Sequence, residues 1–411
     1  MDANGCWGWC MSYMLEGLKI IDAASFLAAP GAATIMADYG ADVIKVEAPR
    51  GDAYRLLHGR YHHDYNWHLT SRNKRDIGLD ISKEEGRAVL HRLIDDADVL
   101  LINFREDQVK KYELEYKALK ARNKRLIYAQ LTGFGTVGPD KHKRGFDITG
   151  WWARTGIMDL IKPHGGPPTF PVGGVGDHAS AMTLFGAIMM ALYQREKTGE
   201  GKYVSTSLVA NGCWANGMHL QGVIAGYDLG SILDEKGYRS PFAMVYKTRD
   251  ERFIVLVLTN PAKEWPQLVT CLGHPEWIED ERFPDIRAIM KQRDLVRDMF
   301  SDVIGSKNLS DICLALDKEN LTYAAIEKIS DVVQDAHLIE NEIIIKTNSD
   351  NPDFQWTVAN PIQIHGEDQR PPTDPPEIGE HSREILLEAG YAESDIEKLL
   401  ASGVVTAQPS S

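Results

Sequence analysis

The chain has 411 residues, of which 43% are hydrophobic and 25% are charged, and its formal net charge is −14. Because this length exceeds one ordinary hydrophobic core, we expect two domains or one large domain with a smaller one attached. The composition is typical of soluble globular proteins, and the acidic balance argues against a nucleic-acid or anionic-membrane partner.

The N-terminal segment and the cysteines indicate the compartment. The first 17 residues contain no Lys or Arg and only a broken apolar run, which fits neither a signal peptide nor a transit peptide. Residues 1–14 are interpreted as a disordered tail. No later stretch reaches the roughly 18 uninterrupted apolar residues of a membrane helix, so no membrane partner is expected. Five cysteines, few and odd in number, favour a reducing compartment and hence a cytoplasmic protein.

The first half of the chain alternates short apolar runs with helical patterns. Strands are predicted at 18–22, 43–47, 77–81, 99–103, 126–131 and 203–208, and helices at 30–39, 84–97 and 179–198. This alternation predicts an α/β fold, with a Rossmann-like large domain of mostly parallel sheet over residues 15–225. Ligands of such sheets bind at the carboxyl ends of the strands. The long Trp/Gly/Pro-rich connection 147–171 precedes the most apolar helix, and connections of that length are usually functional or linkers.

The second half of the chain does not continue this alternation of strands and helices. Residues 226–338 are interpreted as a smaller α+β domain, with hairpin strands at 242–247 and 253–258 followed by charged amphipathic helices. Residues 339–411 are interpreted as a C-terminal segment that returns to the large domain. That segment contains a Pro-rich run at 369–376 and helices at 382–389 and 393–402.

Two patterns resemble cofactor sites but lack the supporting context. Residues 133–138 have the spelling G-x-G-x-x-G, yet Pro139 and the charged loop 140–144 follow instead of a helix, so a pyrophosphate would find no helix N-terminus. The histidines His58, His62, His63 and His68 accompany no metal-ligand spacing and are interpreted as solvated loop residues. No metal and no tightly bound cofactor are expected.

The segment 173–178, Gly-Gly-Val-Gly-Asp-His, leads directly into the long apolar helix. The structural interpretation of Asp177 is a helix N-cap, because Asp is preferred at that position. The functional interpretation is an exposed reactive carboxylate. The glycines would allow a ligand to approach closely, and the helix dipole would favour the ionised form.

The order of motifs along the chain resembles the class III CoA-transferase family of CaiB/BaiF type, which includes formyl-CoA, carnitine and phenyllactate CoA-transferases. The resemblance covers the whole chain after the tail. It rests on residues 15–18, Asp22, 28–30, 37–49, 73–75, 102–104, 132–139, 195–204 and 390–399.

The resemblance implies an enzyme that moves CoA from an acyl-CoA to a carboxylic acid, with Asp177 as nucleophile. Aspartyl–acyl anhydride and aspartyl–CoA thioester intermediates would follow one another. It also implies an interlocked homodimer of ring-like subunits, with each site between the large domain of one chain and the small domain of the other. Coenzyme A and acyl-CoA would be substrates.

By the same resemblance, CoA would lie along the loop 25–30 and the positive residues after the second strand. The implied contacts are Phe26, Leu27, Ala28, Arg72, Lys74, Arg75, Asn103, Phe104, Lys111, Arg144 and Phe146. Two departures from the family pattern stand out. Ala48 occupies a position where some members have an arginine, and residues 258–261 read Leu-Thr-Asn-Pro where formyl-CoA transferase has a glycine-run lid.

Other functions stay open from the sequence. A related α-methylacyl-CoA racemase uses a His–Asp pair, whereas Phe146 precedes Asp147 in this chain, which favours transfer over proton movement. Asp147 is interpreted either as a carboxylate supporting the site or as a helix cap. A non-catalytic acyl-CoA-binding protein is a further alternative.

The loop that begins at residue 145 is most similar to members that act on 2-hydroxy acids such as aryl-lactates or 2-hydroxyisocaproate. Trp151, Trp152 and Met158, with His178, would then contact the acyl group. Core or dimer packing is the alternative role for these side chains.

Overall fold

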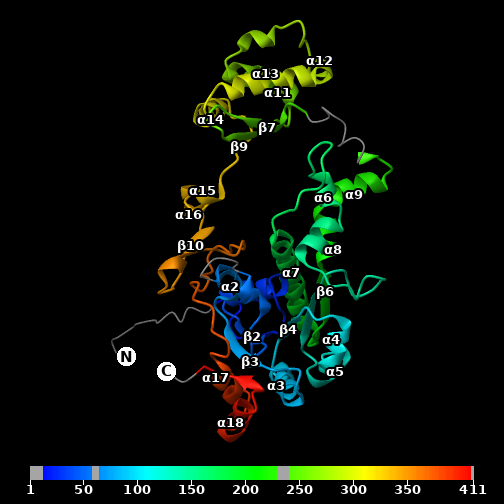
Figure 1. Cartoon of the computed structure of the whole chain (residues 1–411), viewed down its shortest axis with the longest axis vertical. Coiled ribbons are helices and arrows are strands. Elements are labelled where there is room, and N and C mark those ends of the chain that lie inside the picture. Colours follow the sequence, from blue (N-terminus) through cyan, green and yellow to red (C-terminus); the bar gives the residue numbers. More distant parts are fainter. Residues whose placement is uncertain (1–12, 58–63, 230–239, 409–411) are drawn as a thin grey trace, which may run out of the picture. The chain divides into compact units, whose positions relative to one another are not determined.

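The computed structural model describes residues 13–57, 64–229 and 240–408 (Figure 1). The chain packs as two compact units. The first combines the residues up to 161 with 168–220 and those from 339 onward, and the second comprises 162–167 and 221–338.

A seven-stranded sheet forms the centre of the first unit, in the order β12-β3-β2-β1-β4-β5-β6. Its strands are β1 (Lys19–Asp22), β2 (Asp42–Glu47), β3 (Arg75–Leu79), β4 (Val99–Ile102), β5 (Ile127–Thr132), β6 (Tyr203–Ser207) and β12 (Val405–Thr406). Strands β1 to β6 pair in parallel, and β12 joins β3 in the antiparallel sense. The predicted α/β class with a mostly parallel sheet is therefore confirmed.

Helices cover both faces of this sheet because the side chains of its strands point alternately to each face. One face packs against α1 (Ala28–Asp38), α7 (Val175–Thr198) and α8 (Leu208–Ala215). The other packs against α3 (Glu84–Asp95), α5 (Tyr116–Arg122), α17 (Ser382–Glu388) and α18 (Glu393–Ala401). The C-terminal helices thus belong to the core of the first unit.

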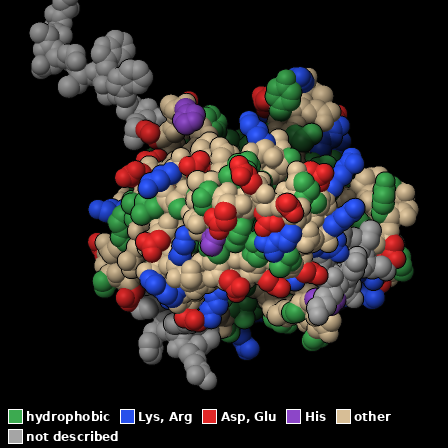
Figure 2. Space-filling model, turned by 90° about the horizontal axis from the view of Figure 1, so that it is seen from above, with side chains coloured by type: hydrophobic (Ala, Val, Ile, Leu, Met, Phe, Trp, Pro, Cys, Tyr) green, Lys and Arg blue, Asp and Glu red, His purple; other side chains and the backbone are tan. Residues whose placement is uncertain are grey.

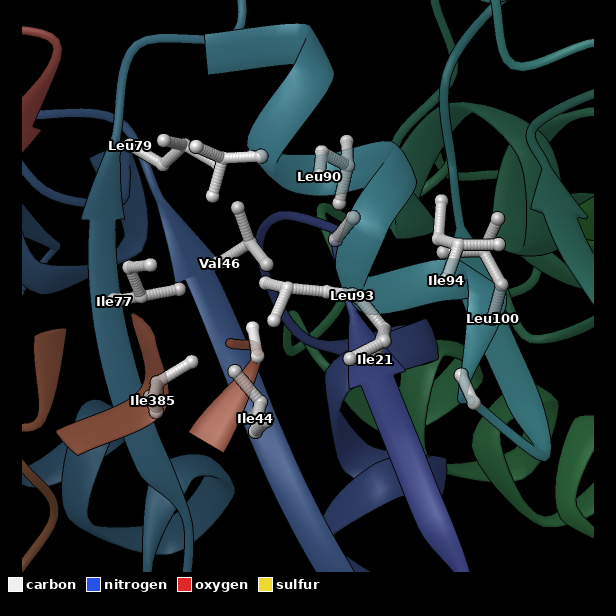
Figure 3. Close-up of a cluster of buried hydrophobic side chains, with 14 of the residues drawn as sticks. Ile21, Ile44, Val46, Ile77, Leu79, Leu90, Leu93, Ile94, Leu100 and Ile385 are labelled. Atoms are coloured by element: carbon white, nitrogen blue, oxygen red, sulfur yellow. The ribbon is translucent and has the colours of Figure 1, made fainter. Parts of the chain in front are cut away.

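Figure 3 shows how the second of these faces is filled. Ile44 and Val46 of β2 and Ile77 of β3 point toward the same layer as Leu90 of α3 and Ile385 of α17. All five side chains are at most 8% exposed. Aliphatic residues at alternate strand positions therefore hold α3 and α17 on the sheet.

Helix α7 is long and apolar enough to span a membrane by length and composition, and it is the one such helix among the described residues. No helix of this kind was predicted from the sequence. In the fold, α7 packs on α1 and on the sheet, where Ala181, Leu184, Ile188 and Ala191 are buried. Its role in this core accounts for part of its apolar composition.

Shorter elements complete the two units. They are η1 (Ala53–Leu56), α2 (Tyr65–Ser71), α4 (Glu106–Lys111), the π-helix η2 (Ile148–Ala153), α6 (Ile157–Leu160), α9 (Gly217–Ile224), α15 (Ile329–Val332), α16 (Ala336–Glu340), β10 (Ile344–Lys346), η4 (Pro352–Phe354) and β11 (Trp356–Val358). The predicted connection 147–171 is therefore partly helical.

The second unit is built on a three-stranded antiparallel sheet of β7 (Ala243–Lys247), β8 (Phe253–Val257) and β9 (Tyr323–Ala325). Its helices are α11 (Pro261–Leu272), η3 (Pro275–Ile278), α12 (Ile286–Lys291), α13 (Arg293–Gly305) and α14 (Leu309–Lys318). They enclose a separate core around Phe242, Trp265 and Phe300.

On the molecular face shown in Figure 2, acidic and basic side chains are interspersed among apolar ones.

Candidate active site

A cavity of about 620 Å³ lies in the first unit, where β1, β4 and β5 end. This edge of an open parallel sheet is where ligand sites form, and the volume is in the range of small-molecule sites. Its lining comprises Ser25, Phe26, Asn103, Phe104, Arg105, Glu106, Gln108, Val109, Lys110, Glu115, Tyr116, Tyr128, Gln130, Thr132, Gly133, Gly135, Thr136, Lys141, Lys143, Arg144, Gly145, Phe146 and Tyr203. Five of the predicted CoA contacts are in this lining, namely Phe26, Asn103, Phe104, Arg144 and Phe146.

Three tyrosines form one side of the cavity. The ring centroids of Tyr116, Tyr128 and Tyr203 lie 5.0–5.6 Å apart. The Tyr203 hydroxyl donates to Gln130, whose amide nitrogen donates to the Phe104 carbonyl at 2.9 Å. This aromatic wall, which the sequence analysis did not identify, presents surfaces on which a planar heterocycle could stack.

Basic side chains form the rim of the cavity. They are Arg105, Lys110, Lys141, Lys143 and Arg144. Glu106 accepts hydrogen bonds from Lys110 and Lys141, and these two cations lower the pKa of the Glu106 carboxyl to about 2. Arg144 is exposed and forms no ion pair within the described part of the chain. The rim therefore carries surplus positive charge suited to an anionic ligand.

The ends of β1 and β4 are tied together at the cavity. The side-chain oxygen of Asn103 accepts from the Ser25 amide at 3.0 Å, and its nitrogen donates to the Ser25 carbonyl at 2.7 Å. Both polar ends of the Asn103 side chain are thus engaged within the protein. Asn103 thereby fixes the loop that follows β1. Its contact with CoA stays a prediction.

Phe26 occupies that loop with a positive φ of 65°, which is uncommon for a residue with a side chain. The Asp52 carboxylate holds this conformation, because both of its oxygens lie 3.3 Å from the Phe26 amide. Asp52 also accepts from the Tyr54 amide at 3.0 Å and from Lys45 at 3.2 Å. The Phe26 ring meets Phe146 edge-on at 5.3 Å, so two loops converge at this end of the cavity.

Leu27 and Ala28, the next predicted contacts, are buried and outside the cavity lining. Leu27 packs with Tyr54 and Trp67 in a small cluster that Phe26 adjoins, whereas Ala28 opens α1 within the main core. Of the three predicted contacts in this loop, only Phe26 lines the cavity, together with its neighbour Ser25.

The predicted CoA contacts Arg72 and Lys74 are paired with carboxylates of the first unit. Arg72 is 3% exposed and pairs with Asp38 of α1 at 2.8 Å. The Lys74 ammonium is fully buried, 2.9 Å from Asp22 and 2.8 Å from the Pro30 carbonyl. Lys74 therefore supports the loop after β1 from beneath and does not line the cavity.

Arg75 and Lys111 also lie outside the lining. Arg75 forms ion pairs with Asp42 at 2.7 Å, Glu384 at 2.8 Å and Glu388 at 2.9 Å, and so ties β3 to α17. Lys111 is exposed at the end of α4 and covers the ring of its neighbour Tyr112. A direct role of these residues in binding CoA stays a prediction.

Asp177 lies in the first turn of α7, which begins at Val175 after the left-handed Gly174. It is half-buried and receives no hydrogen bond or ion pair from the described residues. The N-cap interpretation is wrong, because Gly174 occupies the cap position. The carboxylate of Asp177 therefore has no partner within the described residues.

Asp147 performs the capping that was expected of Asp177. Its two carboxylate oxygens accept from the backbone amides of Gly174 at 2.6 Å and Gly176 at 3.1 Å. A Cβ on Gly176 would lie 2.3 Å from both Asp147 Oδ1 and Trp151 Cγ. Close packing at the start of α7 therefore requires a glycine at position 176. The sequence had predicted that this glycine allows a ligand to approach.

The electrostatics of Asp177 differ from the expected helix-dipole effect. Burial, and secondly the negative charge of Asp147, raise the pKa of Asp177 to about 7. A helix N-terminus contributes about 0.3–1 kcal/mol, which is less than one pKa unit. The ionised form of Asp177 is therefore disfavoured overall. Its carboxyl group, with a pKa near neutral pH, acts next to Asp147, which follows the cavity-lining Phe146 in the chain.

The predicted acyl contacts fall into two groups. Trp151 is 8% exposed and packs in the core with Trp152, whose ring centroid lies 4.8 Å away. Met158 is half-buried in α6, and His178 is exposed next to Asp177, with its pKa lowered by desolvation. Trp151 is accounted for by packing in the core. His178 follows Asp177 in the first turn of α7 and is exposed.

The glycine spelling at 133–138 has a packing explanation. A Cβ on Gly133 would lie 2.7 Å from the Gly145 Cα, so two backbone segments cross there. Turns and loop follow this segment, as predicted from Pro139. Among the described residues no group of three metal-ligating side chains occurs. His58, His62, His63, Cys6 and Cys10 lie outside the described residues.

Comparisons with known proteins identify the family of the chain. The family model for CoA-transferase family III matches residues 15–382. The chain is 29% identical to (R)-2-hydroxy-4-methylpentanoate CoA-transferase of Clostridioides difficile, over 95% of this chain and 99% of that one. It is 30% identical to cinnamoyl-CoA:phenyllactate CoA-transferase of Clostridium sporogenes, over 94% and 96%.

A solved structure extends the likeness to the fold. The CAIB/BAIF family protein from Brucella suis matches with a TM-score of 0.81 and 27% identity, over 92% of this chain and all of that one. The cavity lining does not include Asp177, so the family match and the relatives carry the assignment. The chain belongs to CoA-transferase family III and is a CoA-transferase.

Proposed function

We propose that this enzyme transfers CoA by covalent catalysis at Asp177. A carboxylate oxygen of Asp177 attacks the thioester carbon of the donor, the C–S bond breaks, and CoA leaves as thiolate. The thiolate attacks the aspartyl carbonyl of the resulting anhydride, which releases the donor acid and leaves an aspartyl–CoA thioester. The acceptor carboxylate reverses these steps, so no ATP is consumed.

The observation that carries the proposal is the state of the Asp177 carboxylate. It is half-buried and unpaired within the described structure, on a helix start that Asp147 fixes through two backbone amides. With its pKa raised to about 7, a substantial fraction is ionised at neutral pH. Such an anion has lost part of its hydration without gaining a partner, which favours attack on a thioester.

The cavity supports a place for CoA. We assign its phosphates to the rim of Lys141, Lys143 and Arg144, because these cations surround the opening. The tyrosine wall would accept the adenine ring by stacking. Arg72, Lys74 and Arg75 are left out of this assignment because they lie outside the cavity lining and already pair with carboxylates of the first unit.

We propose 2-hydroxy acids as the acyl substrates. Two similar relatives are named for (R)-2-hydroxy-4-methylpentanoate and for phenyllactate, whose carbon skeletons are apolar. Phe26 and Phe146 line the cavity, and Leu27 lies next to Gly174 at the start of α7. These apolar and aromatic side chains suit a branched or aromatic skeleton.

The racemase alternative is disfavoured by the state of Asp147. Both of its oxygens accept backbone hydrogen bonds, and it is 4% exposed. Phe146, which occupies the position of the racemase histidine, cannot exchange a proton. Neither residue of the expected acid–base pair is therefore available to move an α-proton.

We further propose a cytoplasmic homodimer. Large apolar side chains are exposed on α7, α8 and α9, where Met190 is 75%, Trp214 87% and Met218 79% exposed. Exposed apolar surfaces of this kind are typical of subunit interfaces. Cys213, Cys271 and Cys313 are free thiols, as expected in a reducing compartment.

A single-turnover assay tests the chemistry. An acyl-CoA donor is mixed with enzyme without an acceptor, and free acid and free thiol are measured separately. The proposal predicts a burst of about one equivalent of acid per site with no matching thiol, since CoA stays on Asp177. A hydrolase releases both products together. Asp177→Asn should abolish the burst.

A further inference from the structure

A buried acid on the central sheet takes no part in the transfer chemistry. Asp76 of β3 is fully buried, and its Oδ1 accepts from the Gly379 amide at 2.6 Å. Its other oxygen, Oδ2, is also buried and receives no hydrogen bond from a donor group of the described residues. A buried carboxylate oxygen without a donor costs free energy, whereas a protonated carboxyl can itself donate a hydrogen bond.

The neighbouring strand supplies an acceptor for such a proton. Asp76 pairs with Lys45 in the register of β2 and β3, so Glu47, two residues further along β2, lies on the same face of the sheet. The carboxyls of Glu47 and Asp76 form a hydrogen bond with each other. Two carboxyls can share a hydrogen bond only when one of them keeps its proton.

The surrounding ion pairs indicate which carboxyl keeps the proton. Three buried carboxylates of β1, β2 and the turn after β2 each have a cation within 3.2 Å, in the pairs Asp22–Lys74, Glu47–Arg55 and Asp52–Lys45. Asp76 forms no ion pair with a described residue. With Asp76 this buried network contains four carboxyls and three cations. It is therefore neutral only when Asp76 is protonated.

The electrostatics of the pair agree with this assignment. Burial, and secondly the charge of Glu47, raise the pKa of Asp76 well above its usual value. Burial also raises the pKa of Glu47, but its hydrogen bonds with Arg55 and Asp76 outweigh this effect, so the pKa of Glu47 is lowered overall. Asp76 is thus the donor and Glu47 the acceptor.

The segment 376–382, which leads into α17, is bound at the same place. The amide of His381 donates to the Asp76 carbonyl at 3.1 Å, and its ring nitrogen Nδ1 accepts from the Asp76 amide at 3.3 Å. Arg55 donates to the Pro376 carbonyl at 2.8 Å. The C-terminal part of the chain therefore joins the sheet at the protonated acid.

We propose that Asp76 keeps a proton at neutral pH, donates it in a hydrogen bond to Glu47, and so acts as a pH-sensitive latch for the segment 376–382. When the segment opens, water reaches Asp76 and the proton leaves to solvent, because the pKa of the solvated carboxyl returns to its ordinary value of 3.8. Opening therefore releases a proton at any pH between that value and the pKa of the closed state. In this window each pH unit favours the open segment by up to about 10-fold.

Hydrogen exchange of the peptide that contains Gly379 and His381, measured by mass spectrometry, tests the latch. Protection is the exchange rate of an unstructured peptide at the same pH divided by the rate observed in the protein. In the wild-type protein we expect protection to fall about 10-fold or more from pH 5 to pH 8. Asp76→Asn accepts from Gly379 and donates permanently to Glu47, so its protection should match the wild type at pH 5 and fall about 10-fold less.

Two comparisons separate this effect from other titrations. Asp177 titrates in both proteins, so the difference between them isolates Asp76. Asp374→Asn removes an exposed carboxylate two residues before the segment and should keep the wild-type pH dependence.

Four results would overturn the inference. They are wild-type protection that does not fall with pH, an equal fall in the wild type and Asp76→Asn, protection already lost in Asp76→Asn at pH 5, and an Asp76→Asn protein that does not fold. The last two would show that the ionised carboxylate holds the segment, since an amide replaces a protonated acid but not an anion.

Discussion

The carboxylate of Asp177 is half-buried with no described donor, so its ionised form costs the folded protein free energy. Its folded pKa of about 7 exceeds the ordinary value of 3.8. The folded state therefore binds the proton more tightly than the unfolded state, and this destabilisation grows as the pH rises from about 4 to about 7.

Asp177→Asn should accordingly stabilise the protein. We expect a gain of about 1–3 kcal/mol above pH 7, after allowance for partial exposure, and no gain near pH 4. Denaturant unfolding of both proteins at pH 4.5 and pH 8 checks this. If the two proteins differ in their free energy of unfolding by the same amount at both pH values, ionisation of Asp177 does not destabilise the folded state.

Gly176 offers a second test at the same helix start. Gly176→Ala would place a methyl group 2.3 Å from Asp147 Oδ1 and Trp151 Cγ, so we expect a loss of about 1–3 kcal/mol and at least about 10-fold in kcat. The matched control is Gly186→Ala in the same helix, where no atom lies within 4 Å. That variant should gain up to about 1 kcal/mol. Equal effects of the two changes would contradict the packing role.

A local motif alone did not decide the role of single residues. The glycine setting of Asp177 fits both a helix cap and a reactive carboxylate, and only the family resemblance favoured the second. The role of Lys74 could not be predicted, because its partner Asp22 is 52 positions away and only the fold brings them together.

At the scale of elements, the basic residues divide into those inside the fold and those on the rim. Lys74→Met would remove the ion-pair partner of the buried Asp22 and leave it the Ala24 amide and the more distant charge of Lys45, so we expect about 3–5 kcal/mol of destabilisation. Arg144→Met should leave stability within about 0.5 kcal/mol and raise the KM for acyl-CoA about 10-fold or more. Unfolding curves and KM values for the two variants give this comparison. An unchanged stability with a raised KM in Lys74→Met would restore its predicted contact with CoA.

The parallel strands matched their predictions within a few residues because each is a short apolar run between polar turns, for example β2 at Asp42–Glu47 against 43–47. Helix α7 begins at Val175, four residues before the predicted start, because Asp147 supplies a cap from elsewhere in the chain. Strand β12 has only two residues and exists through its pairing with β3, so no sequence pattern could reveal it.

For the whole molecule, the exposed apolar side chains of α7 to α9 predict association. Light scattering should give about twice the chain mass of 45.9 kDa, and Trp214→Glu should shift the protein toward the monomer. Leu314→Glu, at a side chain 62% exposed on α14, is the control and should not change the mass. A wild-type protein that stays monomeric at micromolar concentration would contradict the proposed dimer.

The central claim is that the acyl group and then CoA are carried on Asp177. Its most direct test is the mass of the peptide containing Asp177 after the enzyme reacts with an acyl-CoA and is quenched in acid. We predict an increase equal to CoA minus water, converted to a hydroxamate by hydroxylamine and absent in Asp177→Asn. An unmodified peptide from enzyme that completes the acid burst, or wild-type transfer by Asp177→Asn, would contradict the account.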